Sequence, residues 1–141
     1  MSGRESYLEA RVLSADPLEL VCLLYQHAID AVRDAGTHLA KGDIRARSEA
    51  ISKAVAIVGE LNSSLEHSLG GPISRNLEQL YRYITARLTE ANLKKDMTRL
   101  AEVERLLITL ADGWRQVQAG QTSPKLWQES GEVLAGQHWS A

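Results

Sequence analysis

The feature that most constrains this chain is the position of its three prolines and most of its glycines, which interrupt long segments of helical pattern. Asp16-Pro17-Leu18-Glu19 has the chemistry of a helix N-terminus: the aspartate accepts a free backbone N–H, the proline has none to satisfy, and the glutamate can reach back. Gly70-Gly71-Pro72 stops one helix and starts the next. These signals predict long helices joined by tight turns.

The remaining turn signals divide the chain into four such helices. Gly42-Asp43 ends the first and caps the second, Asp96 caps the fourth, and Gly120 ends it. The predicted helices cover about residues 17–40, 43–69, 72–94 and 96–119. Because each connection is only about two to four residues long, consecutive helices must be antiparallel.

An apolar stripe with three- and four-residue spacing follows each predicted helix, whereas no segment alternates with the period of a strand. We therefore expect an all-α, antiparallel up-down-up-down four-helix bundle (16–119), with an N-terminal capping segment (1–15) and a C-terminal tail (120–141). The predicted inner faces are Val21, Leu24, Tyr25, Ala28, Val32, Ala35 and Leu39; Ile44, Ile51, Ala54, Val55, Val58, Leu61, Leu65 and Leu69; Ile73, Leu77, Leu80, Tyr81, Ile84, Leu88 and Ala91; and Leu100, Val103, Leu107, Leu110, Trp114 and Val117.

Composition limits the functional classes. The 141 residues suffice for one domain, and 16 Lys and Arg against 18 Asp and Glu give a net charge of −2, which argues against nucleic acid as a partner. Cys22 is the only cysteine, so a reducing compartment suits the chain. The N-terminus lacks the apolar region of a signal peptide, and the longest apolar run, 20–25, is far shorter than the roughly 20 residues of a membrane span. We expect a cytoplasmic protein that is not inserted into a membrane.

Sequence patterns typical of catalysis or metal binding are missing. A ferritin-like metal bundle needs a Glu three positions before an inward-facing His, and no histidine of this sequence has one. Phosphate-binding glycine loops and nucleophile elbows are also missing. We expect no enzymatic activity, no metal and no cofactor.

A histidine phosphotransfer module is one alternative function for a four-helix bundle. His27 is its best candidate, because it lies off the apolar stripe of the first helix. Asp30, however, stands where a cation would be needed to steady a phosphoryl group, so the local charge opposes this function.

More apolar side chains are present than a bundle core needs. Those off the inner stripes are Leu20, Leu23, Ile57, Tyr83, Leu106 and Ile108, and others flank the bundle at Tyr7, Leu8, Val12 and Leu13 and at Leu126, Trp127, Val133, Leu134 and Trp139. Such a surplus must cover something or bind something. It predicts a hydrophobic groove outside the bundle, partly shielded by the chain's own termini and able to accept an apolar helix or an extended peptide.

Several short motifs, in order and with matching spacing, carry a family resemblance. They are Val12-Leu13-Ser14-Ala15-Asp16-Pro17, Leu24-Tyr25, Lys53-Ala54, Gly70-Gly71, Asn76-Leu77, Leu80-Tyr81-Arg82-Tyr83-Ile84, Arg87-Leu88, Glu90-Ala91-Asn92-Leu93-Lys94-Lys95-Asp96 and Glu102-Val103-Glu104. Over about residues 7–119 the sequence resembles the flagellar secretion chaperones of the FliS family.

The resemblance implies a cytosolic four-helix bundle that binds the disordered C-terminal segment of flagellin, prevents its premature polymerisation and aids flagellar type III secretion. It implies a groove of Ile57, Leu61, Leu77, Tyr81, Tyr83, Ile84 and Leu88, to which helical geometry adds Ile108. In the family the N-terminal segment covers part of the groove, and here Tyr7, Leu8, Val12 and Leu13 occupy the matching place; simple N-terminal packing is the alternative. A helical adaptor for some other peptide also remains open.

Further partners permitted by the resemblance are an export-gate protein, an anti-sigma factor and a flagellin-level regulator, for a chain that is a monomer or a weak homodimer. Two departures stand out: Arg82 replaces the acidic or polar residue usual between the two tyrosines, and the tail 120–141 is long and rich in tryptophan. Within that tail, residues 125–135 could form a short helix. We hypothesise that the tail docks on its own bundle or on a neighbour and competes with flagellin; a disordered end is the alternative.

Overall fold

The structure of the protein, a computed structural model, describes residues 17–65, 71–120 and 127. Its helices are α2 (Pro17–Lys41), α3 (Ile44–Ser63), α5 (Gly71–Lys94) and α6 (Met97–Gln118), and the described residues contain no strand. The all-α four-helix bundle is therefore confirmed.

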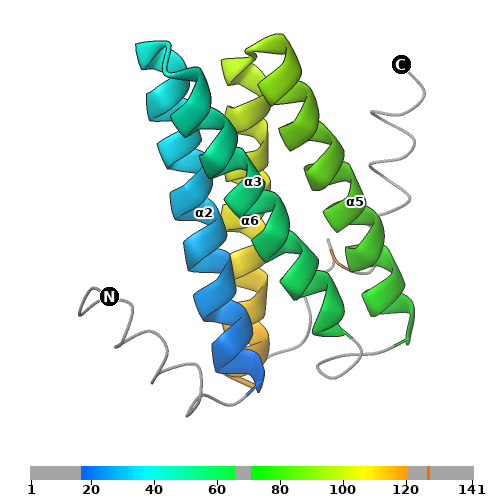
Figure 1. Cartoon of the computed structure of the whole chain (residues 1–141). Helices are drawn as coiled ribbons and strands as arrows, with labels where there is room; N and C mark the ends of the chain where they lie inside the picture. The colour runs from blue at the N-terminus through cyan, green and yellow to red at the C-terminus, as the bar shows by residue number, and fades with distance from the viewer. Residues whose placement is uncertain (1–16, 66–70, 121–126, 128–141) are drawn as a thin grey trace.

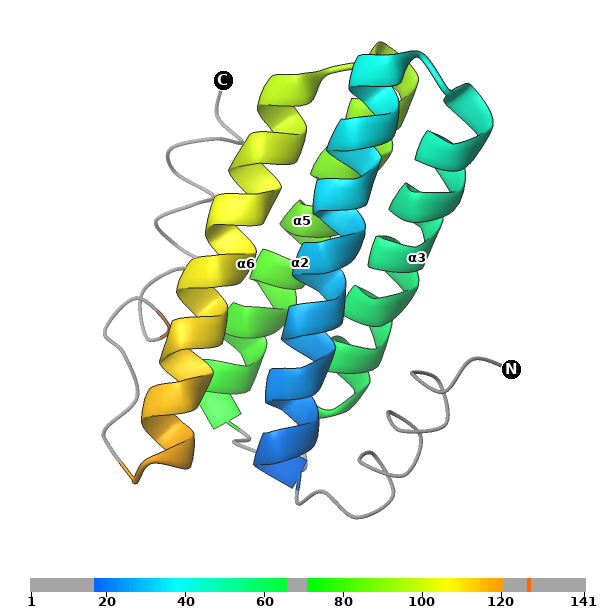
Figure 2. The same ribbon diagram turned by 90° about the vertical axis from the view of Figure 1, so that its left-hand side faces the viewer.

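In Figure 1, α2 and α5 run upward and α3 and α6 run downward. Helix α2 packs against α3 and α6, and α5 packs against the same two helices, so α2 and α5 face each other diagonally (Figure 2).

Both predicted aspartate caps inside the described chain are confirmed. The carboxylate of Asp43 accepts the backbone N–H of Ala46 at 3.1 Å, and that of Asp96 accepts the N–H groups of Thr98 and Arg99 at 2.9 and 3.3 Å. Each cap satisfies backbone donors that the first helical turn leaves free. Together they fix the two tight turns at one end of the bundle; the predicted cap Asp16 lies outside the described residues.

Helix α3 ends at Ser63, six residues before the predicted end. The hydroxyl groups of Ser63 and Ser64 donate to the carbonyl oxygens of Gly59 and Glu60, and the Ser74 hydroxyl of α5 donates to the carbonyl of Leu65. The predicted apolar stripe continues past this point, so α3 is shorter than its stripe.

The core consists mainly of the predicted inner faces. All of their described members are buried except Ile44, which is 57% exposed, and Leu24, Leu39, Val55, Ile73 and Val117, which are half-buried. The prediction for Ile44 was wrong: this residue is the first of α3, at the end of the stripe, and its side chain stays exposed. Ile29, Ala31 and Ala111 are buried in addition, because a helix that contacts two neighbours buries an arc wider than one stripe.

A buried polar cluster joins three helices at the centre of the core. The hydroxyl groups of Tyr25 on α2 and Tyr81 on α5 share a hydrogen bond of 2.6 Å, in which either can donate. The indole N–H of Trp114 on α6 donates to the Tyr25 hydroxyl at 3.0 Å. All three side chains are at most 2% exposed, so each depends on the others for hydrogen bonding.

Replacing Tyr25 by Phe should destabilise the protein more than replacing Tyr81. Tyr25→Phe leaves both the Trp114 N–H and the Tyr81 hydroxyl without their partner, whereas Tyr81→Phe affects only the Tyr25 hydroxyl. Each unsatisfied buried group costs about 1–3 kcal/mol. Urea unfolding followed by far-ultraviolet circular dichroism measures both losses, and an equal or larger loss for Tyr81→Phe would contradict the arrangement.

The same cluster makes stability depend on alkaline pH. Burial raises the pKa of Tyr25 well above its ordinary value and that of Tyr81 to about 12. Above about pH 10 the unfolded chain releases tyrosine protons that the native state keeps, so the free energy of unfolding should fall by about 1.4 kcal/mol per pH unit for each buried tyrosine. Urea titrations from pH 9 upward should show a shallower fall for Tyr81→Phe; an unchanged slope would contradict the linkage.

Candidate functional site

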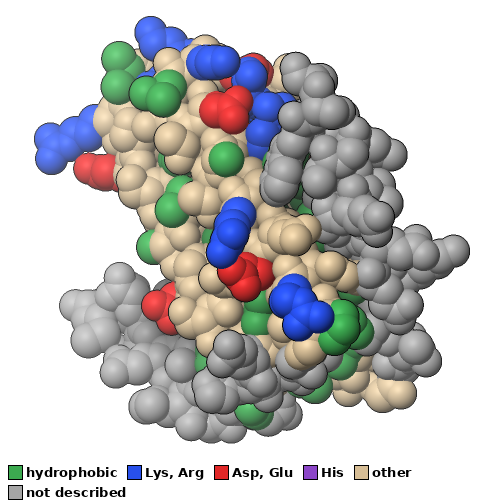
Figure 3. All heavy atoms as spheres, turned by 90° about the vertical axis from the view of Figure 1, so that its right-hand side faces the viewer, with side chains coloured by type: hydrophobic (Ala, Val, Ile, Leu, Met, Phe, Trp, Pro, Cys, Tyr) green, Lys and Arg blue, Asp and Glu red, His purple; other side chains and the backbone are tan. Residues whose placement is uncertain are grey.

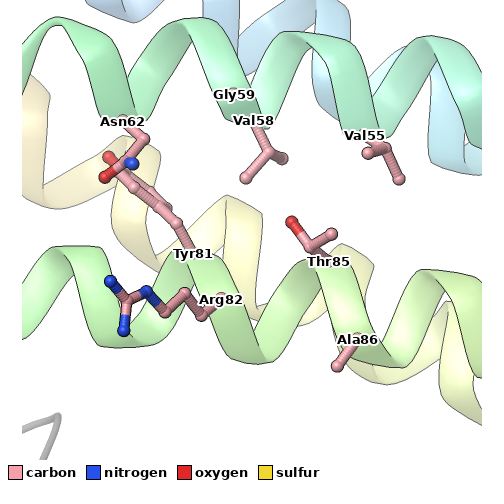
Figure 4. Close-up of a pocket in the computed structure, with 8 residues that line it drawn as sticks. All are labelled: Val55, Val58, Gly59, Asn62, Tyr81, Arg82, Thr85 and Ala86. Atoms are coloured by element: carbon pink, nitrogen blue, oxygen red, sulfur yellow. The ribbon is translucent and has the colours of Figure 1, made fainter.

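An open groove lies between α3 and α5, with a volume of about 400 Å³. Its lining is mainly apolar or small and comprises Val55, Val58, Gly59, Asn62, Tyr81, Arg82, Thr85 and Ala86. Figure 4 shows Val55 and Val58 pointing from α3 toward α5, and Thr85 pointing back from α5. Gly59, Thr85 and Ala86 are too small to close the seam between the two helices, so apolar surface remains open.

The groove differs in character from floor to rim. Tyr81 contributes its ring to the lining while its hydroxyl belongs to the buried cluster, so the floor is part of the core. Arg82 is exposed at the rim and pairs with Glu78 one turn earlier, which reduces the positive charge that a partner would meet. A second hollow of about 510 Å³, more polar and containing Arg75 and Glu78, shares Asn62 with the groove.

Most of the predicted groove residues lie in the core. Leu61, Leu77, Ile84 and Leu88 are at most 1% exposed, and Tyr81 alone of the eight predicted residues lines the groove between α3 and α5. These residues hold the helices together, and substituting them tests folding before it tests binding.

Tyr83 lies on the other side of α5, in the seam with α6. It is 4% exposed, and its hydroxyl donates to the Glu102 carboxylate at 2.7 Å, while burial and that carboxylate raise the pKa of Tyr83 to about 12. The Arg87 guanidinium donates to the other Glu102 oxygen at 2.7 Å, and Arg99 pairs with Glu90 at 3.0 Å. This network joins α5 to α6, and Tyr83 does not line the groove between α3 and α5.

The last two predicted groove residues are half-buried. Ile57 packs against the core from α3 but is not among the residues that line the groove. Ile108 lines a separate hollow of about 200 Å³ between α2 and α6, beside Ile29 and Ala111. The eight residues therefore do not form one surface, and the capping residues Tyr7, Leu8, Val12 and Leu13 lie outside the described chain.

Beyond Gly120, Trp127 is the residue of the predicted tail that the structure describes, and it is fully buried against its own bundle. Its ring lies 4.8 Å from that of Trp114, centroid to centroid, and its carbonyl accepts the Asn76 side-chain N–H of α5 at 3.0 Å. Gly113 of α6 allows this approach, because a Cβ there would lie 2.7 Å from the indole. Within the described part of the chain, the indole N–H of Trp127 has no hydrogen-bond partner.

Sequence reasoning missed the open seam between α3 and α5. The available signal was small residues at positions that face each other, Gly59 on one helix and Thr85 and Ala86 on the other. These small residues are not part of the surplus of large apolar side chains on which the groove prediction was based. Sequence reasoning did single out Trp127, but it could not identify Gly113 as the position that accommodates the indole.

The described residues contain no group of three or more His, Cys, Asp and Glu placed to hold a metal, and none of the described helices is long and apolar enough to span a membrane. A helical bundle with an apolar groove is the architecture of a protein-binding module.

A family model described as "Flagellar protein FliS" matches residues 1–121. The flagellar secretion chaperone FliS of Salmonella typhimurium is 39% identical over 135 residues, which are 92% of this chain and 96% of that protein. FliSB of Pseudomonas aeruginosa is 36% identical over 107 residues (76% and 85%), and FliS of Escherichia coli 31% over 132 residues (90% and 95%).

The chain belongs to the FliS family of flagellar secretion chaperones. The function of this family is not enzymatic, as the sequence predicted. The alternative of phosphotransfer through His27 is accordingly set aside.

The contact of Trp127 with Gly113 predicts an unusual response to alanine. Glycine to alanine inside a helix normally stabilises by about 1 kcal/mol, and Gly59→Ala should do so because its methyl group would meet open space. Gly113→Ala should instead destabilise, because the displaced indole gives up about 1.5–3 kcal/mol of burial. Urea unfolding compares the two variants.

The same exchange in a Trp127→Ala background supplies the control. With the indole gone, Gly113→Ala should stabilise as Gly59→Ala does. If Gly113→Ala already matches Gly59→Ala in the otherwise unchanged protein, then the indole does not occupy this position in solution.

Proposed function

We propose that the protein is a cytosolic export chaperone that binds the disordered C-terminal segment of flagellin in the groove between α3 and α5. The observation that carries the proposal is the open apolar seam of Val55, Val58 and Thr85 over the Tyr81 ring. Family membership supports the client class, and the groove supplies a surface of suitable chemistry.

An apolar groove suits a client that lacks a folded partner. A disordered segment buries its apolar side chains only when it meets a complementary surface, and it folds as it binds. Each well-buried apolar side chain contributes about 1.5–3 kcal/mol, against an ordering cost of about 2–5 kcal/mol or more. A few anchors along the seam are therefore enough for stable binding, and no chemical step is needed.

The same surface explains how binding would prevent polymerisation. A client segment held in the groove has its apolar face covered, so that face is not available to other flagellin molecules. In this proposal the N-terminal segment 1–15 shields part of the groove until the client arrives, which lowers the apolar surface exposed by the free chaperone.

Charged side chains at Thr85 test the groove. Thr85 points into it and is only half-buried, so Thr85→Glu and Thr85→Lys should fold yet oblige the client to desolvate a charge. We expect each variant to weaken binding about tenfold or more. The measurement is calorimetric titration with the C-terminal segment of flagellin from the same organism.

Thr109 provides the matched control. It is an exposed threonine on α6 that does not line the groove, so Thr109→Glu and Thr109→Lys should bind as the unchanged protein does. The two variants carry charges of opposite sign. A loss of apolar packing weakens client binding by both, whereas a simple charge effect would weaken binding by one variant and strengthen it by the other. Tight binding by both Thr85 variants would place the client elsewhere on the bundle.

A further inference from the structure

The large hydrophobic side chains that are most exposed among the described residues lie at one end of the bundle. Ile44 is 57%, Leu93 79% and Met97 44% exposed. They belong to three different helices: Ile44 begins α3, Leu93 is in the last turn of α5, and Met97 begins α6. Single exposed apolar residues are ordinary on a protein surface. These three, however, all lie at the same end of the bundle and are not spread over its surface.

Contacts between neighbouring helices place all four helices at this end. Arg47 of α3 donates through Nε to the Asn92 side chain of α5 at 2.9 Å, which puts Ile44 and Leu93 on adjoining helix ends. A Cβ on Gly36 of α2 would lie 3.6 Å from the Met97 sulfur, which puts the start of α6 beside the last turns of α2. We call the surface of Ile44, Leu93 and Met97 the end patch.

Basic side chains lie at the same end of the bundle as the end patch. Lys41, Lys94 and Lys95 are exposed, and none of them pairs with a carboxylate of the described chain. The nearby Asp43 and Asp96 carboxylates are already bonded to backbone N–H groups of the caps. Figure 3 shows several blue side chains at the upper end of the molecule, with green and red side chains among them. This end is thus positive although the chain as a whole carries a charge of −2.

The buried Arg47 adds a further positive charge under the end patch. Its guanidinium bonds to the Asn92 side-chain oxygen and backbone carbonyl, which are neutral groups, and it is only 5% exposed. The lysines at helix C-termini complement the helix dipoles, but that role does not require exposed Leu, Ile and Met between them. Apolar anchors within a basic rim are complementary to a segment with apolar side chains flanked by Asp and Glu.

We infer that the end patch is a second docking surface, which binds an acidic, apolar segment of a partner protein other than flagellin. The surface is formed by helix ends, whereas the groove follows the sides of α3 and α5, so the inference does not depend on the proposed client site. A chaperone with both surfaces can hold its client and a second protein at once.

Photo-cross-linking in flagellated cells tests the end patch directly. A photoreactive phenylalanine analogue replaces Leu93 in the full chain, or, as a control, Gln79, which is exposed on the same helix about four turns earlier. We expect an adduct at Leu93 that is missing at Gln79, and peptide mapping should place it in a segment rich in Asp or Glu and apolar residues.

Charge reversal supplies the second measurement. Lys41→Glu together with Lys94→Glu should reduce the Leu93 adduct roughly tenfold, whereas Lys53→Glu, an exposed lysine on the side of α3, should leave it unchanged. Thr85→Glu should also leave it unchanged, which separates this surface from the groove. An adduct that survives the double reversal would overturn the inference.

Other identities of the adduct are equally decisive. A flagellin adduct would assign this end to the client, a lipid adduct would make it a membrane-facing surface, and an adduct with a second copy of this chain would make it a homodimer contact. Any of these results, or the lack of an adduct, overturns the inference of an acidic protein partner.

Discussion

The hydrogen-bonded cluster of Tyr25, Tyr81 and Trp114 is the constraint on which the rest of the bundle depends. It joins α2 to α5 across the diagonal of the bundle and ties both to α6. Polar groups this deeply buried are stable only when each finds its partner, so the three helices must keep their mutual depth and rotation. Because the Tyr81 ring also lines the groove, the position of the groove is set by the centre of the core.

Helix α5 meets its two neighbours through different chemistry. Toward α3, small side chains leave apolar surface open. Toward α6, the seam is closed at one end by Tyr83 and Arg87 on Glu102, and at the other by the Trp127 indole over Gly113. A closed seam on one side gives α5 a rigid support, so the open seam can remain unfilled without loss of the fold.

Much of the fold could be predicted from sequence because helix ends and apolar periodicity are local properties. The caps Asp43 and Asp96 and the helical stripes were visible in this way, and so was the surplus of apolar side chains. The residues that line the groove could not be predicted in this way. Tyr83 and Ile57 were assigned to it by family resemblance, whereas their positions depend on how the helices are rotated against each other. Likewise, no local pattern reveals that Gly113 makes room for an indole 14 positions later in the chain.

The Trp114 contact also bears on the order in which the chain can fold. Its hydrogen bond to Tyr25 joins residues 89 positions apart, while the Tyr25 and Tyr81 hydroxyls are 56 positions apart. Contacts between distant residues form late, because the intervening chain must first be ordered. In a growing chain that contains α2, α3 and α5 but not yet α6, the Tyr25 hydroxyl lacks the hydrogen bond from the Trp114 indole. Completion of the core, and with it of the groove floor, therefore waits until α6 has been synthesised.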